Sequence, residues 1–145
     1  MAGMMSRLLS GFVLAILMFG AAECRAGNIW ETGNSIYEVI GYDMRAHGGQ
    51  QPLTDYETNA VCLLLGYFRG FAESAAIASH YDATAMPFYL PDSITNVQIE
   101  EVVYKFLTEN PDKLGERGDA LITAALASAY PNPSFTPISE RGKEK

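Results

Sequence analysis

DYETNAVCLLLGYFRGFAESAAIAS, residues 55–79, is the stretch of sequence that decides the fold. Its apolar residues recur every three or four positions, which is the spacing of one helix face. A second apolar stripe beside the first makes more than half of the circumference apolar, as in a helix covered by others. The first stripe comprises Val61, Leu64, Leu65, Phe68 and Ala72, and the second comprises Leu63, Tyr67, Phe71 and Ala75. Residues 55–79 are therefore predicted to form a central helix that its neighbours wrap.

Two capping boxes mark the starts of helices. Thr54 and Glu57 have the spacing in which a Thr hydroxyl accepts a hydrogen bond from the third backbone N–H and the acid reaches back to the cap. Thr95 and Gln98 repeat this pattern before a second apolar face at helical spacing. That face consists of Ile99, Val102, Val103, Phe106 and Leu107. The opposite face of this helix, with Glu100 and Glu101, is predicted to be solvated.

A helix is also predicted before the central one, over residues 35–47. Its apolar positions follow helical spacing, Asn34 or Ser35 is the expected N-cap, and the pair Gly48-Gly49 ends it.

A last helix is predicted to begin directly after residue 110. Asn110, Pro111 and Asp112 supply an N-cap, a proline at the first helical position and an acid in the first turn. The pattern continues to about Tyr130, and Pro131 ends it. Because no stretch alternates in the manner of a strand, the predicted fold is all-α, a compact bundle of about four helices around a central apolar helix.

The N-terminal residues have the layout of a secretory signal peptide. Arg7 supplies a positive charge before an apolar run over residues 8–22. This run of 15 residues is shorter than the roughly 18 to 20 that span a bilayer, which argues against a permanent anchor. Small residues permit cleavage after Ala22 or after Ala26, and we favour Ala26. The expected organisation is a signal peptide (1–26), one helical domain (27–131) and a flexible tail (132–145).

The charge of the chain argues against nucleic acid as a partner. The chain has 10 basic and 17 acidic residues, of which Arg7, Arg25 and Glu23 lie in the first 26, so the remainder has a net charge of −8. A surface of this sign repels phosphate backbones and favours a basic protein partner. Cys24 and Cys62 are too few for a disulfide framework.

The side chains that carry catalysis or bind metals are sparse. The two histidines, His47 and His80, lie near predicted helix ends and make a poor metal site. No nucleophile elbow, phosphate loop or dinucleotide fingerprint occurs. Cys62 is expected to be a buried thiol on the central helix. Glu100 and Glu101 diverge by about 100° on a helix, so they make a poor acid pair. We therefore expect no catalytic residue, no cofactor and no metal.

Two glycines on the central helix suggest a close helix contact. Gly66 and Gly70 are one turn apart, with Tyr67 between them, and this spacing lets a second helix approach closely. Packing inside the domain is the expected use.

From Leu64 to Pro131 the order of motifs resembles the Rap/Tai family of type VI secretion amidase immunity proteins. That family shows a G-Y-hydrophobic-x-G helix, then F-C-x-P, V-T-x-x-Q, V-V-x-x-(Y/F)-L, x-P-x-x-L and A-L-x-x-A-(F/Y)-P. The matching residues here are Gly66, Tyr67, Gly70, Phe88, Pro91, Ile94, Thr95, Gln98, Val102, Val103, Phe106, Leu107, Pro111, Leu114, Ala125, Leu126, Tyr130 and Pro131.

The resemblance implies a periplasmic, non-enzymatic protein that binds a peptidoglycan amidase effector and blocks its active-site groove. It also allows a homodimer. We expect the blocking element to be the connector, defined as residues 81–92, because its prolines stiffen it before binding. The residues expected to contact the amidase are Tyr81, Asp82, Met86, Phe88, Tyr89 and Asp92.

This chain departs from the family at its cysteines. Tyr89 and Asn132 stand where the family usually has cysteine, and Leu64 stands at the start of the usual C-L-G-Y motif. The resemblance therefore implies that the family's disulfides are lost and that helix packing alone holds this fold.

Two other functions are compatible with the residues. A periplasmic adaptor or envelope structural protein could keep the same helical fold without a toxin partner. A small hydrolase would need His47 or His80 as its base.

Cleavage after Ala26 makes a prediction about the exported protein. It removes Cys24 and leaves Cys62 alone, so no disulfide can form within one chain. The intact mass of the protein isolated from the periplasm should be that of a chain beginning at Gly27. A reductant should leave this mass unchanged. A product that retains Cys24 and gains two hydrogen masses on reduction would contradict this.

Overall fold

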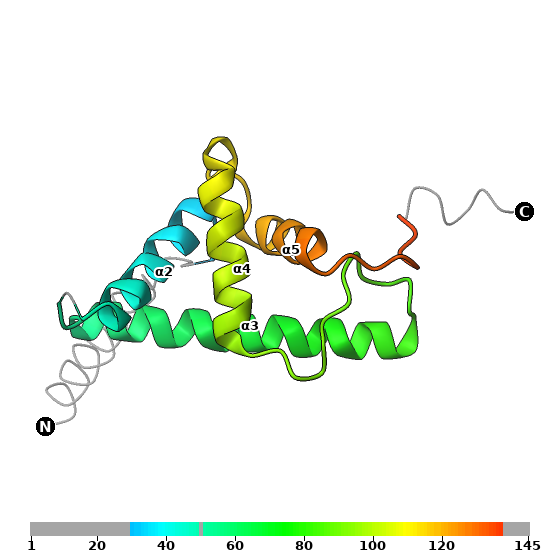
Figure 1. Ribbon diagram of the computed structural model, residues 1–145, viewed down its shortest axis with the longest axis horizontal. Helices are drawn as coiled ribbons and strands as arrows, with labels where there is room; N and C mark the ends of the chain where they lie inside the picture. The colour runs from blue at the N-terminus through cyan, green and yellow to red at the C-terminus, as the bar shows by residue number, and fades with distance from the viewer. Residues whose placement is uncertain (1–29, 50, 138–145) are drawn as a thin grey trace, which may run out of the picture.

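The computed structural model describes residues 30–49 and 51–137, and these form four α-helices and one short 3-10 turn. The helices are α2 (Gly33–His47), α3 (Asp55–Tyr81), α4 (Asn96–Glu109) and α5 (Gly118–Ala129), and the turn η1 is Pro111–Lys113 (Figure 1). Within the described residues there are only two isolated β-bridges and no strand. The prediction of an all-α fold is confirmed. The predicted signal peptide lies outside the described residues.

Helix α3 is the platform on which the other helices pack. In Figure 1, α2, α4 and α5 all lie on one side of it. Its buried side chains form a single stripe of Ala60, Val61, Leu64, Phe68, Ala72 and Ala75. Leu63, in the second predicted stripe, is 52% exposed. The described neighbours of α3 therefore cover the face with the first stripe, and most of the second predicted stripe lies outside this cover.

The uncovered face of α3 changes two further expectations. Cys62 is exposed and not buried, since it lies about 100° around the helix from the buried Val61. Gly66 and Gly70 are exposed too, and a Cβ atom added at either would meet nothing within 4 Å. The close helix contact predicted at these glycines does not exist within the described chain.

Length and composition alone would let α3 cross a membrane, and 28% of its most apolar window is buried. The core helix of a globular domain satisfies the same criteria, and α3 carries the core here.

The core lies between the buried stripe of α3 and the inner faces of the other three helices. The side chains with almost no exposed surface include Ile36 and Ile40 of α2, Val103 and Leu107 of α4, and Ile122 and Leu126 of α5. Burial of such side chains contributes about 1.5–3 kcal/mol each. The predicted apolar face of α4 is confirmed for Ile99, Val103 and Leu107, which are buried.

Both predicted capping boxes are present. The Thr54 hydroxyl accepts from the Glu57 N–H at 3.3 Å, and the Thr95 hydroxyl accepts from the Gln98 N–H at 3.2 Å. The predicted cap of α2 is wrong. Thr32, and not Asn34 or Ser35, caps this helix, because its side chain accepts from the Ser35 N–H.

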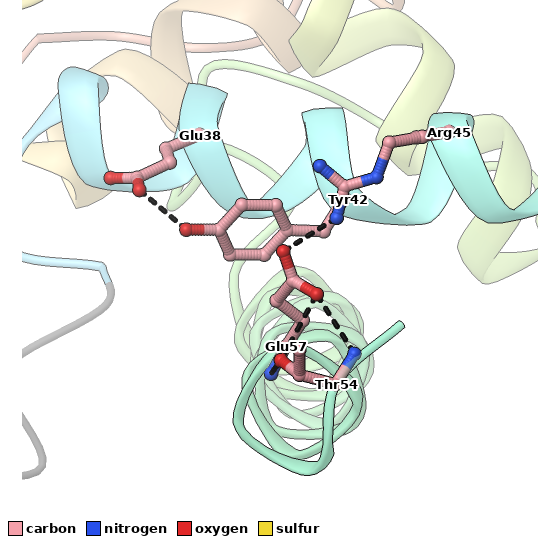
Figure 2. A network of polar contacts seen from close by, with 5 residues as sticks. All are labelled: Glu38, Tyr42, Arg45, Thr54 and Glu57. Atoms are coloured by element: carbon pink, nitrogen blue, oxygen red, sulfur yellow. Dashed lines mark hydrogen bonds and ion pairs between the residues drawn. The ribbon is translucent and has the colours of Figure 1, made fainter. Parts of the chain in front are cut away.

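Glu57 also joins α3 to α2. One of its carboxylate oxygens accepts from the Thr54 N–H at 2.8 Å, and the other accepts from Arg45 of α2 at 2.5 Å (Figure 2). These bonds, the one from the Thr54 backbone first, lower the pKa of Glu57 below its ordinary value. Arg45 lies 5.5 Å from the centre of the Tyr42 ring. The Tyr42 hydroxyl donates to Glu38, and this bond raises the pKa of Tyr42 to about 12.

The predicted start of the last helix is wrong. Pro111–Lys113 forms only the turn η1, and α5 begins at Gly118. Asn110 caps no helix start with its side chain. Its amide donates to the Phe106 carbonyl at 2.8 Å and so closes the end of α4.

Residues 114–118 pair with the start of α2, and this pairing explains why α5 begins only at Gly118. The Asn34 N–H donates to the Leu114 carbonyl at 2.8 Å, and the Gly118 N–H donates to the Glu31 carbonyl at 3.0 Å. A Cβ atom at Gly118 would lie 2.1 Å from the Trp30 carbonyl oxygen, so only glycine fits there. The chain between η1 and α5 is extended at Arg117 because it pairs with this distant segment.

The Gly118→Ala substitution should therefore destabilise the fold by about 2–4 kcal/mol, because an added methyl group forces two backbone segments apart. The matched control is Gly41→Ala in α2, where a Cβ atom meets nothing within 4 Å. That change should stabilise the protein by up to about 1 kcal/mol through helix propensity. Urea denaturation of both variants gives the two free energies. Equal effects of the two substitutions would contradict the close contact between Gly118 and the Trp30 backbone.

Candidate partner-binding site

The connector is folded against the core by Phe88. This side chain is 1% exposed, and its ring stacks on Phe71 of α3 with the ring centres 6.0 Å apart. Phe88 thus fixes the middle of the connector from inside the molecule, and its neighbour Tyr89 is 62% exposed.

The residues that follow α5 hold the connector from the other side. Phe88 and Pro131 form an isolated antiparallel bridge, in which the Tyr89 N–H donates to the Tyr130 carbonyl at 2.9 Å. The Asn132 N–H donates to the Pro87 carbonyl at 3.0 Å. The Asn132 side-chain amide donates to the carbonyls of Ala83 and Met86, at 2.7 and 2.9 Å. These bonds join segments more than 40 residues apart in sequence and fix the backbone of the connector.

Two surface hollows flank the exposed Tyr89 ring. The first, of about 370 Å³, is lined by Ala75, Ala76, Ser79, His80, Phe88, Tyr89, Leu90 and Asp92. The second, of about 420 Å³, is lined by Ser79, Ala83, Tyr89, Tyr130, Pro131, Asn132, Pro133 and Ser134. Tyr89 and Ser79 belong to both. An aromatic side chain standing between two concave surfaces is a suitable anchor for a protein interface.

The connector residues predicted to contact a partner are not equivalent in the structure. Tyr81, Asp82, Tyr89 and Asp92 are exposed, Met86 is half-buried, and Phe88 is buried. Asp82 shapes the connector locally, since its carboxylate accepts from the Thr84 N–H at 2.8 Å. Asn132 was not among the predicted residues, and only the tertiary contact with the connector shows its role.

The predicted motif residues mostly serve the scaffold. Thr95 and Gln98 form the cap of α4, and the Pro91 carbonyl accepts from the Ile94 N–H at 3.0 Å in the turn before it. Tyr67 stacks on Trp30, with the ring centres 5.0 Å apart. Gly66 and Gly70 lie on the exposed face of α3 and contact no other element.

The histidines are placed as predicted, at helix ends. His47 is the last residue of α2 and its ring nitrogen lies 3.2 Å from the Asp43 carboxylate one turn earlier. His80 lies in the last turn of α3, with its ring against Tyr81. Over residues 30–49 and 51–137, no group of three His, Cys, Asp or Glu side chains could hold a metal ion.

The expectation that Glu100 is solvated is wrong. It is 5% exposed, because α2 packs beside this part of α4, and it is the buried charged residue of the described core. Burial, and then the neighbouring Asp43 carboxylate, raise the pKa of Glu100 to about 7, while His47 lowers it. Glu101, the next residue, is exposed.

The sequence matches the Rap1a immunity proteins over residues 32–132, which is more than two thirds of the chain and includes α2, α3, α4, α5 and the connector. The chain belongs to the Rap1a family of immunity proteins. Comparisons with curated proteins and with solved structures gave no match.

Membership gives the function class. Rap1a immunity proteins neutralise the amidase effectors of type VI secretion systems, act in the periplasm and are not catalytic. The resemblance inferred from the motifs is confirmed. The bridge between Phe88 and Pro131 orders the connector, which is the segment expected to contact the amidase.

The same bridge lies where the motif resemblance implies two cysteines in other members of the family. Tyr89 and Asn132, which stand at the two positions where the resemblance implies cysteine, lie on the paired segments, and both line the second hollow. Hydrogen bonds from Tyr89 and Asn132 therefore join these segments. Helix packing is therefore supplemented by these hydrogen bonds between the connector and the segment after α5.

Glu100 makes the stability of this Rap1a-family protein depend on pH. Its folded-state pKa of about 7 lies above its ordinary value of 4.5, so folded protein retains a proton that unfolded protein releases. The contribution of Glu100 to the free energy of unfolding is therefore full below pH 4.5 and falls by about 1–3 kcal/mol as the pH rises to 7.

The Glu100→Gln substitution should remove this fall, and its advantage over the wild type should grow between pH 4.5 and 7. Urea denaturation across this range measures the difference, with the exposed Glu101→Gln as the matched control. A constant difference between Glu100→Gln and the wild type over the range would contradict a buried, protonated Glu100.

Proposed function

We propose that this Rap1a-family protein neutralises its amidase by inserting the connector into the active-site groove of the enzyme, with Tyr89 as the anchor. The observation that carries the proposal is the exposed Tyr89 ring, which stands between two hollows on a backbone fixed by Phe88 and Asn132. An inhibitor of this kind needs no catalytic group, since it acts by filling the groove.

The order of the connector before binding supports tight inhibition. Ordering a free loop at an interface costs conformational entropy, and a loop that is already ordered avoids this cost. Here, three hydrogen bonds from Asn132 and one from the Tyr89 N–H hold the connector in place. Pro87 and Pro91 restrict its backbone further.

Charge supports association with a basic enzyme. The chain without its first 26 residues has a net charge of −8, and Asp92 lies at the edge of the first hollow. Such a field accelerates the encounter with a positively charged partner and adds less to the final affinity. Asp92 could pair there with a basic side chain of the amidase, while the apolar stem of that side chain rests on Ala75 and Ala76.

Export and organisation belong to the same proposal. The signal peptide over residues 1–26 would deliver the protein to the periplasm, where the family acts. The helical domain would end at residue 131 and the tail would follow from residue 132, although Asn132 itself bonds to the connector. A homodimer, which the family resemblance allows, is also proposed.

The Tyr89→Ala substitution should weaken binding to the amidase about 10–100-fold, as for a buried aromatic anchor. The measurement is calorimetric titration with the amidase effector encoded beside this protein, together with release of peptidoglycan fragments by that enzyme. The matched control is Tyr56→Ala, at the far end of α3, where the tyrosine is 70% exposed and should not contact the amidase. Equal affinity of Tyr89→Ala and Tyr56→Ala would remove Tyr89 from the interface.

A further inference from the structure

Asp92 places a carboxylate without a partner in the first hollow. Its side chain lines this hollow and is exposed, and within residues 30–49 and 51–137 it forms no hydrogen bond or ion pair. The other acid of the connector, Asp82, accepts from the Thr84 N–H and does not line the hollow. Asp92 is therefore the negative charge that the first hollow offers to a ligand.

The end of α3 adds negative potential at the same place. Ser79 and His80 lie in the last turn of α3, and both line the first hollow. The last carbonyl groups of a helix lack N–H partners within the helix, so this end of a helix carries a partial negative charge. A cation in the hollow would therefore face both Asp92 and the end of α3.

No Arg or Lys side chain of the described chain fills the first hollow. Each of these side chains has a polar partner elsewhere, namely Arg45, Arg69, Lys105, Lys113 and Arg117. His80 is the basic group of the lining, and its ring packs edge-on against Tyr81. The cation that would balance Asp92 must therefore come from a partner.

The walls of the first hollow suit the stem of a long basic side chain. Ala75, Ala76 and Leu90 are apolar and line it together with Tyr89. Long basic side chains rest their methylene groups on apolar surface and keep the charge near water. The guanidinium group of arginine also stacks on aromatic rings and donates two parallel hydrogen bonds to one carboxylate, which an ammonium group cannot do. Tyr89 and Asp92 together therefore favour arginine over lysine.

The second hollow has a different chemistry, although Tyr89 lines it too. No charged side chain lines it in the described chain. Both N–H groups of the Asn132 amide are used within the protein, by the Ala83 and Met86 carbonyls, and its oxygen accepts from the Ser134 N–H at 3.0 Å. A cationic ligand should therefore distinguish the two hollows.

We propose that the first hollow is the binding site for one arginine side chain of the amidase, held by Asp92 beside the end of α3. The inference rests on the proposed insertion of the connector, and it names the chemical group that the connector meets on the enzyme. Tyr89 is then the anchor, and Asp92 determines specificity. An amidase without this arginine would bury the Asp92 carboxylate without a partner, which opposes binding.

The first test uses the exported chain alone, with N-acetyl-L-arginine methylamide as the probe. In an NMR titration, the amide signals of His80, Leu90 and Asp92 should shift with a dissociation constant of about 1–50 mM, as for one ion pair with added packing. Signals of Tyr130 and Ser134, in the second hollow, should not follow this titration. The corresponding lysine compound should bind at least about threefold more weakly.

Two controls decide what this titration means. The norleucine compound has a similar apolar stem and no charge, so it should leave the signals of the first hollow unchanged. Asp92→Asn should abolish the shifts caused by the arginine compound. The absence of saturable shifts, equal shifts with the norleucine compound, or shifts that persist in Asp92→Asn would overturn the proposal.

The second test measures binding to the amidase effector encoded beside this protein. Asp92→Asn should weaken binding about tenfold in calorimetric titration, and Asp92→Glu should recover most of the affinity because it retains a carboxylate. The matched control is Asp112→Asn on η1, an exposed acid whose loss changes the net charge equally. It should change the affinity less than about twofold, because long-range attraction is screened by salt. Equal affinities of Asp92→Asn and Asp112→Asn would overturn the proposal.

The outcomes separate the arginine site from the insertion of the connector. If Tyr89→Ala weakens binding and Asp92→Asn behaves like its control, insertion is supported and the arginine site is overturned. If Asp92→Asn weakens binding and Tyr89→Ala does not, the arginine site is supported and Tyr89 is not the anchor. If the arginine probe remains bound in the complex with the amidase, the first hollow is open in that complex, which overturns both proposals.

Discussion

Burial of one stripe of α3 is the interaction on which the rest of the structure depends. Phe68 has no exposed surface, and it lies at the middle of a stripe that contacts α2 and α4 and forms one core with α5. A single helix cannot bury its own apolar face, so α3 is stable only with these neighbours in place. Because the neighbours share one side of α3, Leu63 and Ile77 on the opposite side are exposed within the described residues.

The same stripe extends toward the connector, the segment proposed to bind the amidase. Phe71 lies beside it on α3 and stacks on Phe88, which anchors the connector. The segment after α5 then closes over the connector through Tyr130 and Asn132. The proposed binding surface is thus fixed by contacts that start in the core. The position of Tyr89 therefore follows from the packing of its neighbour Phe88 on Phe71.

Local signals in the sequence predicted α3 and α4 well, because each capping box satisfies backbone N–H groups within four residues. The start of α5 was not predictable in this way. The pattern at Asn110 and Pro111 is that of a helix start, yet it produces only η1, because residues 114–118 pair with the segment before α2. Glu100 and Cys62 were misplaced for a related reason. Helical spacing shows which faces are apolar, and it does not show which faces find a neighbour.

The sequence by itself determined the all-α class, the capped starts of α3 and α4, the acidic charge and the family to which the chain belongs. These features depend on local hydrogen bonds, on composition and on motif order, and none of them requires contacts between distant segments. Only the tertiary structure decided that α3 is covered on one side, that Glu100 is buried and that Asn132 fixes the connector. These features depend on contacts between segments far apart in sequence, and their energy exists only once the helices have packed.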